Sequence, residues 1–424
     1  MRREPRSIAI YFLARLLNNR QRQNVFTEHP HFVALSFRDR RLVVELVQGV
    51  LRNISRFDYS LSKLSNIQLT KVDELVLWIL RLGLYEIEFL RIPQHATLHQ
   101  AVKLCHKFGK TSAGGYVNGI LRSFLRQPPE LPQGNSETAM AVRFSHPVWL
   151  VRRYLARYGI ELTERFLHRN NQPPLSFLWV NTFRTNLKDF CEKLTIDGIK
   201  YKLHTQLSNC LSLDASNFVQ HPLYKSGHCF FMDPASQGIA YLREFEKFEI
   251  LGDFCCAPGG KSFLLASQKK SAAKLFCCDF SLARLAEARR RSKQYNVPDL
   301  SFVNIDLRES LPFHSVFDFV LLDVPCSGLG TIRTHPDIRW RVRESDLDSH
   351  HAMQVILLEN GFSALKEGAE LIYSTCSTEP EENELVVEEF LASTKGASLL
   401  GNFHRTFPEF DVGEGFFAAR IRKN

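Results

Sequence analysis

The sequence lacks every cysteine spacing that would indicate a zinc ribbon or a thioredoxin-like redox site. Its 424 residues include 10 cysteines, but no Cys-x-x-Cys pair occurs among them, and that spacing supplies the metal ligands or the dithiol in such sites. Four of the cysteines form two directly adjacent pairs in apolar or glycine-rich runs. This usage suits reduced thiols better than a disulfide framework, so we expect a cytoplasmic protein without a bound metal.

The sequence also lacks an uninterrupted apolar run that could cross a membrane. Its longest dense apolar run, residues 75–90, is broken by Arg81, Glu86 and Glu88, whereas a spanning helix needs about 20 mostly apolar residues. The N-terminus is basic and then apolar, but Arg15 interrupts the apolar part and no small-residue cleavage site follows. We therefore expect neither a membrane protein nor a secretory signal peptide.

The glycine turn DFCCAPGGKS, residues 253–262, lacks the spacing of both common phosphate-binding loops. A Walker A loop needs a glycine five positions before its Gly-Lys pair, where this chain has Cys255. The dinucleotide fingerprint needs separated glycines, but Gly259 and Gly260 are adjacent. Adjacent glycines still let a ligand approach the backbone closely. The turn therefore suits a nucleoside without a phosphate, and S-adenosylmethionine is the cofactor that we expect.

Acidic residues are scarce in the first 130 residues, which hold 20 Lys and Arg against 10 Asp and Glu. The other 294 residues hold 34 basic and 35 acidic residues, so the formal net charge of +9 originates in the N-terminal block. A localised basic surplus is typical of a surface that contacts nucleic-acid phosphates. A merely solvated basic face is the alternative that charge alone leaves open.

Hydrophobic periodicity and breakers divide the chain into three domains and a linker. Residues 1–130 carry apolar residues at helical spacing and predict an all-helical domain, and residues 131–139, rich in proline and polar residues, predict a linker. Residues 140–230 combine a helix, a strand (SFLWVNTF) and a second helix (NLKDFCEKLTIDG), which indicates a small α+β module. Residues 231–424 alternate strands with helices, a pattern that predicts an α/β domain with a doubly wound, mostly parallel sheet.

Four acidic residues and a cysteine stand at the ends of the strands predicted for the last domain. Because ligands of such sheets bind beyond the carboxyl ends of the strands, one convergent site is expected from Asp253, Asp279, Asp306, Asp323 and Cys376. Asp279 follows the glycine turn by about 20 residues, where an acidic residue commonly binds ribose hydroxyls. Asp306 closes the third strand and could face an adenine ring.

Two cysteines accompany a carboxylate at neighbouring strand ends, in Asp323-Val324-Pro325-Cys326 and in Thr375-Cys376. A lone cysteine in such a place is more often inert, but two of them beside a cofactor turn favour catalysis. Methylation of cytosine at carbon 5 would use all three groups. A thiolate that adds to carbon 6 activates carbon 5, an acid near ring nitrogen 3 assists this addition, and a base must remove the carbon 5 proton before the thiol leaves.

Five segments resemble the RsmB family (also called Sun or Fmu) of ribosomal RNA cytosine-5 methyltransferases: FMDPASQG, DFCCAPGGKS, LLDVPCSGLGTIRTHPDIRW, YSTCSTEPEENE and GEGFFAARI. The N-terminal helices resemble the NusB-like RNA-binding domain of this subfamily, and the middle module corresponds to its small RNA-recognition-like insert. The resemblance implies an S-adenosylmethionine-dependent Rossmann-like enzyme that acts on 16S ribosomal RNA. We also expect a monomer with no DNA or membrane partner. A transfer-RNA substrate and a non-catalytic RNA-binding scaffold are the alternatives.

The resemblance also implies roles for single residues. Cys376 takes the place of the family's nucleophile, Cys326 that of the cysteine that assists product release, and Asp323 that of a residue that contacts the cofactor and the cytosine. The positions that match the cofactor-binding residues are Cys255, Cys256, Ala257, Pro258, Gly259, Gly260, Lys261, Asp279, Asp306 and Asp323. Lys261 could serve the cofactor or the RNA. Cys256 and Phe280 depart from the family pattern, and the second departure leaves the ribose contact to Asp279 alone.

Four further basic residues follow the Pro-Cys loop: Arg333, His335, Arg339 and Arg341. We expect them to hold the RNA backbone while the target base is unstacked or flipped toward the thiol. An ordinary basic loop is the alternative.

Overall fold

The computed structural model describes residues 4–18, 29–213, 217–243, 245, 249–270, 272–407 and 413–424. The chain divides into two compact units. The first, here called the helical unit, comprises Met1–Gln172 and Ile332–Glu344. The second, here called the sheet unit, comprises Pro173–Thr331 and Ser345–Asn424.

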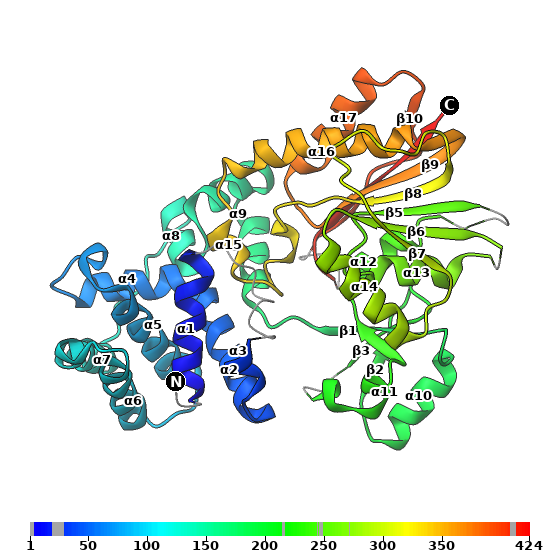
Figure 1. Cartoon of the computed structure of the whole chain (residues 1–424). Coiled ribbons are helices and arrows are strands. Elements are labelled where there is room, and N and C mark those ends of the chain that lie inside the picture. The colour runs from blue at the N-terminus through cyan, green and yellow to red at the C-terminus, as the bar shows by residue number, and fades with distance from the viewer. Residues whose placement is uncertain are drawn as a thin grey trace. The chain divides into compact units, whose positions relative to one another are not determined.

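The described residues of the helical unit form α-helices, short 3-10 turns and connecting loops, which confirms the helical fold predicted for the N-terminal residues (Figure 1). Its helices are α1 (Pro5–Asn18), α2 (Pro30–Val33), α3 (Phe37–Arg52), α4 (Ile54–Leu64), α5 (Glu74–Phe89), α6 (Gln94–Lys107), α7 (Gly114–Arg126), α8 (Glu137–Arg143), α9 (Val148–Asn171) and α15 (Ile338–Arg341). The helix α8 begins within the segment predicted as a linker, and α9 also lies in the helical unit. Among the described helices, none combines the length and the apolar character needed to cross a bilayer.

The apolar run of residues 75–90 becomes α5, at the centre of the helical unit. Its buried face packs so closely on α3 that a Cβ atom at Gly49 would lie 1.9 Å from the Tyr85 ring. Arg81, which interrupts the run, is also buried, and its guanidinium forms two hydrogen bonds of 2.7 Å to the Asp58 carboxylate. The charged residue that breaks the apolar pattern therefore has a partner for its charge inside the unit.

The segment Ile332–Glu344 folds within the helical unit, although it follows the Pro-Cys loop of the sheet unit in sequence. Its helix α15 packs Trp340 against the core of the helical unit, where the indole Nε1 donates to the Leu51 carbonyl oxygen at 2.7 Å. Arg52 donates to the Arg333 carbonyl oxygen at 3.1 Å. The chain therefore passes between the two units three times.

Two of the four basic residues expected to hold RNA are buried in this segment, so that expectation is wrong for them. The Arg339 side chain is fully buried and donates to the carbonyl oxygens of Ser145 and Asn170 at 3.0 and 3.2 Å. Burial lowers the pKa of its guanidinium to about 9. Arg333 is also buried. The Arg339 side chain stabilises the fold of the helical unit, and neither buried side chain is available to an RNA backbone.

The sheet unit begins with a small α+β module, as predicted for the middle of the chain. Four strands form an antiparallel sheet in the order β2-β3-β1-β4. The strands are β1 (Ser176–Val180), β2 (Tyr201–Leu203), β3 (Cys210–Leu213) and β4 (Cys229–Phe231), and the helices are α10 (Leu187–Ile196) and α11 (Pro222–Lys225). β1 and α10 confirm the predicted strand and helix. Their apolar residues form a separate core that includes Leu178, Phe190 and Leu211.

The larger sheet confirms the doubly wound, mostly parallel arrangement. Its strands are β5 (Ile250–Phe254), β6 (Lys274–Asp279), β7 (Leu300–Asn304), β8 (Phe317–Asp323), β9 (Leu365–Thr375), β10 (Ala397–Leu399), β11 (His404–Thr406) and β12 (Phe416–Lys423). The order is β10-β12-β9-β8-β5-β6-β7, with β11 paired to β12. β5 to β9 are parallel, and β12 runs antiparallel beside β9. The carboxyl ends of the five parallel strands therefore share one edge of the sheet.

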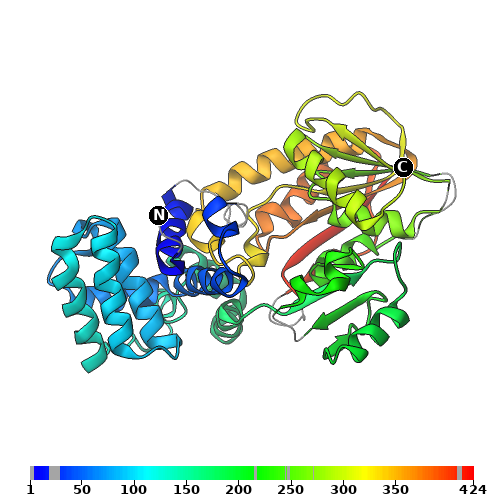
Figure 2. The same ribbon diagram turned by 60° about the horizontal axis from the view of Figure 1, so that its bottom comes forward.

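Helices cover both faces of this sheet. Figure 1 and Figure 2 show α16 (Asp346–Ser363) and α17 (Glu384–Ser393) over one face, and α12 (Pro234–Ala240), α13 (Gly260–Gln268) and α14 (Leu282–Tyr295) over the other. Along β8, Phe319 and Leu321 belong to one apolar core, and Val320 and Leu322 belong to the other. Burial on both sides explains why the strand is continuously apolar from Phe319 to Leu322.

Candidate active site

The glycine turn joins β5 to α13 through two residues with left-handed backbone. Cys255 has a φ of 64° and Gly259 a φ of 99°. At Gly259 a Cβ atom would lie 2.8 Å from the Phe263 ring, so only glycine fits there without strain. The helix α13 begins without a hydrogen bond from a capping side chain. The N–H groups of its first turn therefore point at a site where a ligand carboxylate could bind.

Asp279, at the end of β6, is bonded to the glycine turn. Its buried carboxylate accepts hydrogen bonds from the Ala257 N–H at 3.2 Å and the Ser281 N–H at 3.0 Å. Arg284 Nη1 lies 3.6 Å from the same carboxylate. Asp279 thus orients the turn expected to bind the cofactor, and Arg284 is a second contact to the turn that sequence reasoning missed.

Asp306 lies two residues beyond the end of β7, and its carboxylate is paired with Arg308. The guanidinium donates at 2.9 Å from Nε, and this hydrogen bond lowers the pKa of the Asp306 carboxyl. The pair lies at the edge strand of the parallel set, and both side chains are partly exposed. Asp306 is therefore ionised and already held by a cation.

Asp253 was expected at a strand end but lies inside β5 and is fully buried. It accepts a hydrogen bond from the Ser262 hydroxyl at 2.5 Å. Burial raises the pKa of its carboxyl to about 7. Asp253 therefore stabilises the turn through its hydrogen bond to Ser262 on α13, and its carboxyl titrates near neutral pH.

Lys261 and Asp323 form an ion pair across the site. Lys261 Nζ lies 2.8 Å from Asp323 Oδ2, and Ser374 on β9 donates to the other carboxylate oxygen at 2.8 Å. Burial lowers the pKa of the Lys261 ammonium, but Asp323 and other nearby acidic groups raise it, and the net pKa lies above the ordinary value, so the ammonium stays charged. The Lys261 ammonium also lies 5.3 Å from the centre of the Phe416 ring. The sequence placed both residues in the site but gave no sign of their pairing.

The two expected catalytic cysteines meet at the ends of adjacent parallel strands. Cys326 follows β8, Cys376 follows β9, and their sulfur atoms lie 3.3 Å apart. The hydrogen bond to Cys376 and burial together raise the pKa of the Cys326 thiol. Gly330, in the Pro-Cys loop, donates its N–H to the Cys376 carbonyl oxygen at 3.0 Å. A Cβ atom at Gly330 would lie 2.0 Å from the Gly415 carbonyl oxygen, so this loop also contacts the start of β12 closely.

Sequence reasoning missed the serine that follows each cysteine and the glutamate that joins them. Ser327 and Ser377 both donate their hydroxyls to the carboxylate of Glu382, which is fully buried. The signal was present, because each cysteine stands in a Cys-Ser dipeptide and Glu382 lies in the segment TEPEENE. Periodicity alone could not connect them, since the contact joins three separate loops.

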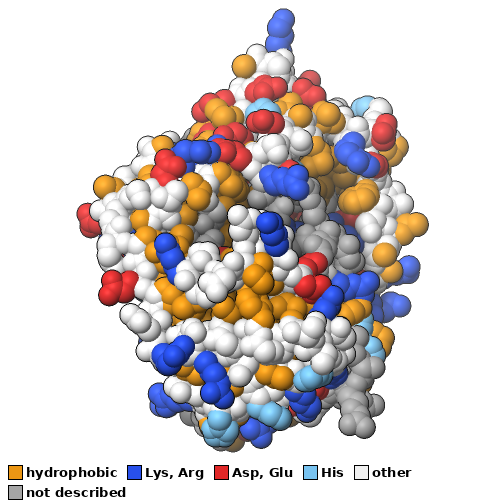
Figure 3. Space-filling model, turned by 90° about the vertical axis from the view of Figure 1, so that its left-hand side faces the viewer, with side chains coloured by type: hydrophobic (Ala, Val, Ile, Leu, Met, Phe, Trp, Pro, Cys, Tyr) orange, Lys and Arg blue, Asp and Glu red, His pale blue; other side chains and the backbone are white. Residues whose placement is uncertain are grey.

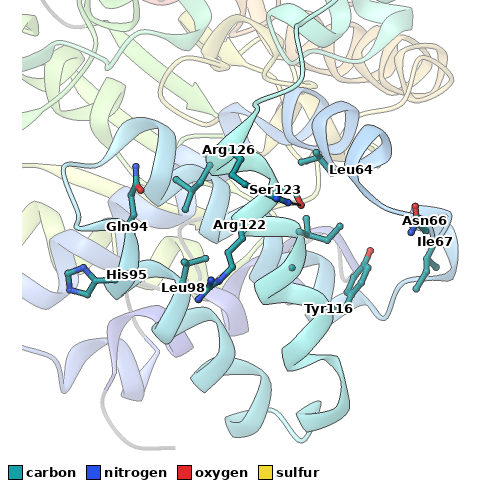
Figure 4. Close-up of a pocket in the computed structure, with 13 residues that line it drawn as sticks. Leu64, Asn66, Ile67, Gln94, His95, Leu98, Tyr116, Arg122, Ser123 and Arg126 are labelled. Atoms are coloured by element: carbon teal, nitrogen blue, oxygen red, sulfur yellow. Dashed lines mark hydrogen bonds between the residues drawn. The ribbon is translucent and has the colours of Figure 1, made fainter.

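A second candidate site is a groove on the helical unit, with a volume of about 940 Å³. Its walls come from the end of α4, the start of α6 and α7, and Figure 4 shows Gln94, His95 and Leu98 on α6 opposite Arg122 and Arg126 on α7. The full lining is Leu64, Asn66, Ile67, Gln94, His95, Leu98, Tyr116, Gly119, Ile120, Arg122, Ser123, Leu125 and Arg126. None of these lining residues is acidic. Figure 3 shows that apolar side chains gather on the face that carries these helices, with Lys and Arg side chains around them.

The two arginines of the groove are not neutralised within the described structure. Arg122 donates to Asn118 at 3.3 Å and Arg126 donates to Ser123 at 3.2 Å, both on their own helix. Neither takes part in a described ion pair, and both side chains are exposed. The groove therefore offers cationic donors above an apolar floor.

The fold and the strand-end site together define a class of enzyme. A parallel set of strands with a glycine turn after its first member, an acidic residue after the second, and an antiparallel strand beside the last is the architecture of S-adenosylmethionine-dependent methyltransferases.

Comparison with known proteins gives the family. The family described as 16S rRNA methyltransferase RsmB/F matches residues 240–422, the NusB family matches residues 3–126, and the ferredoxin-like domain of RsmF/B-like methyltransferases matches residues 146–220. The ribosomal RNA small subunit methyltransferase B of Pectobacterium atrosepticum is 31% identical over 99% of this chain and 98% of its own length. That of Escherichia coli O1:K1 is 31% identical over 92% of both chains. The chain belongs to the RsmB/F family of 16S rRNA methyltransferases.

Solved structures agree with this fold. A protein named PH0851 superposes with a TM-score of 0.84 over 99% of both chains, at 22% identity. A methyltransferase homologue from Pyrococcus horikoshii gives a TM-score of 0.61 at 26% identity, covering 69% of this chain and all of its own. The NSun6 protein of Pyrococcus horikoshii, solved with SFG, gives 0.59 at 19% identity, covering 65% of this chain and 98% of its own.

Proposed function

We propose that this methyltransferase transfers its methyl group to carbon 5 of a cytosine in 16S ribosomal RNA, through a covalent bond between Cys376 and the base. The observation that carries the proposal is the pair of thiols, whose sulfur atoms lie 3.3 Å apart beside the Lys261–Asp323 ion pair. Carbon 5 of cytosine is a poor nucleophile until a thiolate has added to carbon 6. A methyltransferase for an exocyclic nitrogen or a ribose oxygen would need no thiol at all.

In the proposed reaction Cys376 acts as a thiolate, after its thiol has lost a proton to solvent. The thiolate forms a bond to carbon 6, and the electron pair released from the ring double bond makes carbon 5 nucleophilic. Carbon 5 then takes the methyl group that bound S-adenosylmethionine would supply, as the bond between that methyl group and the sulfonium sulfur breaks. A base then takes the proton from carbon 5, the bond between sulfur and carbon 6 breaks, and the double bond returns. Cys326 assists this release, and Asp323 contacts the cytosine during the addition.

The residues around the glycine turn fit the cofactor. The uncapped start of α13 would hold its carboxylate, and the turn from Cys255 to Lys261 would contact its nucleoside through the backbone. Asp279 would contact the ribose. Asp306 would lie near the adenine. Lys261 would also serve the reaction, because its ammonium is bound to Asp323, the carboxylate that would contact the cytosine.

We further propose that the groove of the helical unit binds a single-stranded part of the RNA. Its exposed arginines would contact phosphates, and its apolar floor, with Tyr116, would receive bases. The basic surplus of residues 1–130 supports this assignment.

The family of the chain favours ribosomal RNA over transfer RNA as the substrate, because the matching family is that of 16S rRNA methyltransferases. The presence of both thiols disfavours a non-catalytic scaffold. All ten cysteines are free thiols, which suits a cytoplasmic enzyme; we expect it to act as a monomer and not on DNA.

The test is the variant Cys376→Ala. Methyl transfer to 16S rRNA should fall below detection, because no group remains to activate carbon 5, while S-adenosylmethionine binding should stay within about twofold of the parent protein. Methyl transfer is measured with labelled cofactor, and the site is mapped by bisulfite sequencing. Turnover at the parent rate would rule out Cys376 as the nucleophile.

A further inference from the structure

The proposed reaction gives no role to Glu382, the buried carboxylate behind the two cysteines. Glu382 ends the short 3-10 turn η6 (Pro380–Glu382), and its side chain exposes none of its surface. Burial by itself would raise the pKa of this carboxyl, but hydrogen bonds from its neighbours lower it, and the net pKa lies below the ordinary value. A buried carboxylate that stays ionised needs several hydrogen-bond donors. The residues that supply these donors are therefore the parts of the chain that Glu382 holds in place.

Three of these donors belong to the two serines that directly follow the cysteines. The Ser327 N–H donates to Oε1 at 2.7 Å, and the Ser327 and Ser377 hydroxyls both donate to Oε2. The two serine oxygens lie 3.3 Å apart, the same separation as that between the two cysteine sulfur atoms. One carboxylate therefore joins the loop after β8 to the loop after β9, at the position next to each thiol.

Glu382 itself is held by β9 and α16. The Tyr373 hydroxyl on β9 donates to the Glu382 carbonyl oxygen at 2.6 Å. His350 Nδ1 on α16 lies 2.9 Å from the Glu382 carboxylate. Gln354, one turn further along α16, donates to the Pro325 carbonyl oxygen at 2.9 Å, directly before Cys326. The carboxylate is thus fixed with respect to both strands that carry the thiols.

We propose that Glu382 is a positioning residue that sets the separation of the Cys326 and Cys376 sulfur atoms by holding the residue after each cysteine. The meaning of that separation for catalysis rests on the proposed function, in which one thiol attacks the base and the other assists its release. Both thiols must reach a single cytosine within a near-attack geometry, and a misplacement of about 1 Å can cost a factor of about 100 in rate.

The first experiment measures the geometry without the reaction. In the full-length protein, the oxidant diamide removes two protons and two electrons from a neighbouring thiol pair and is reduced to the hydrazine as a disulfide forms. The rate at which the Cys326–Cys376 disulfide forms is followed by peptide mass mapping. Disulfide formation should be fast in the parent protein and slower by about tenfold or more in Glu382→Gln. The amide of glutamine carries an NH2 group where the glutamate has an acceptor oxygen, so some of the serine donors lose their acceptor and the two loops are no longer held together.

A matched control is Glu370→Gln, which removes the charge of another buried carboxylate on β9. Glu370 binds Arg420 and Arg422 at 2.9 Å each, and none of its described contacts is with the cysteine loops. This variant should lose stability yet keep the parent rate of Cys326–Cys376 oxidation. An equal slowing in both glutamate variants, or an unchanged rate in Glu382→Gln, would overturn the proposal.

The second experiment separates the two loops with milder variants that keep the glutamate. Ser377→Ala should slow the formation of the covalent protein–RNA adduct, because it releases the loop of the attacking thiol. Ser327→Ala should let the adduct accumulate, because it releases the loop of the assisting thiol. A merely structural role would reduce thermal stability in both variants without separating the two steps. Slow oxidation in Glu382→Gln combined with full activity of Cys376→Ala would leave the positioning intact and remove the proposed function instead.

Discussion

At the scale of single residues, the reactivity and charge of each side chain in the site depend on its position and on the groups that it contacts. Cys326 and Cys376 are chemically identical, yet the first follows a proline in a loop that also contacts β12, and the second follows the end of β9. The Lys261 ammonium donates a hydrogen bond of 2.8 Å to the Asp323 carboxylate, which favours its charged form. The role of each residue follows from its place at the sheet edge, since no property of a cysteine or lysine alone would assign it.

Replacing Cys326 should show which thiol acts in the attack on the base and which acts in its release. In Cys326→Ala the attack by Cys376 remains possible, but release is impaired, so a covalent protein–RNA adduct should accumulate to a large fraction of the bound protein. Denaturing gels with labelled RNA measure it. Cys191→Ala, a partly buried thiol in α10, serves as the control and should give no adduct. If RNA is bound without any adduct in Cys326→Ala, the release role is wrong.

Asp253 should make the stability of the sheet unit depend on pH. Its carboxyl has a pKa of about 7 when folded, raised by burial, against about 3.9 when unfolded. The folded protein therefore holds this proton more tightly, and stability is lost as the pH rises through the window from about 4 to about 7. The loss is at most roughly 1.4 kcal/mol per pH unit.

The variant Asp253→Asn keeps the size of the side chain and removes this titration. Its melting temperature should fall less than that of the parent protein between pH 5 and pH 7.5, by a difference of a few degrees. Differential scanning calorimetry at several pH values gives both slopes. Parallel slopes in the two proteins would mean that Asp253 does not carry the shifted pKa.

At the scale of elements, α7 presents one side to the groove and should contribute to RNA binding through its exposed arginines. Each phosphate contact on single-stranded nucleic acid changes the slope of log K against log salt by about 0.7. The double variant Arg122→Glu/Arg126→Glu should therefore reduce the salt slope for a 16S rRNA fragment by about 1.4. The double variant Arg38→Glu/Arg41→Glu makes the same change of charge on α3, outside the groove. An equal effect of the control would assign binding to general charge and not to the groove.

The elements were predictable because their patterns are local. Alternating strands and helices predicted the doubly wound sheet, and the acidic residues at Asp279 and Asp323 were placed correctly at strand ends. Asp253 was misplaced by one residue, since β5 continues through Phe254 and its buried carboxylate bonds to Ser262. Glu382 was missed because its partners lie on loops whose meeting depends on which strands are neighbours, and the order of strands is not written in any one segment.

At the scale of the whole molecule, the segment Ile332–Glu344 belongs to the helical unit although it follows the Pro-Cys loop of the sheet unit in sequence. The sequence could not predict this, because Arg339 binds the Ser145 carbonyl oxygen, which lies 194 positions away. A basic residue after a catalytic loop is usually read as a contact to nucleic acid. Here burial among backbone carbonyls makes it part of the fold.

Removing the Arg339 guanidinium should loosen this segment. In Arg339→Leu, buried carbonyl oxygens lose their donor, at a cost of about 2–4 kcal/mol, and the segment should be cut faster by protease while cofactor binding is unchanged. Arg341→Leu is the control, because Arg341 pairs with Asp337 within the segment itself. Equal cleavage rates in the two variants would show that the buried arginine does not anchor the segment.

The position of this segment in the chain has a consequence for biosynthesis. A ribosome completes Gln172 well before Glu344, and the 172 residues between them take roughly 10–35 s to make at about 5–20 residues per second. During that time the long helices of the helical unit have been synthesised but α15 has not. The carbonyl oxygens of Ser145 and Asn170 therefore lack their hydrogen-bond donor, the Arg339 guanidinium. The N-terminal part of the nascent chain therefore cannot finish folding first, and its last native contacts form only after the Pro-Cys loop has left the ribosome.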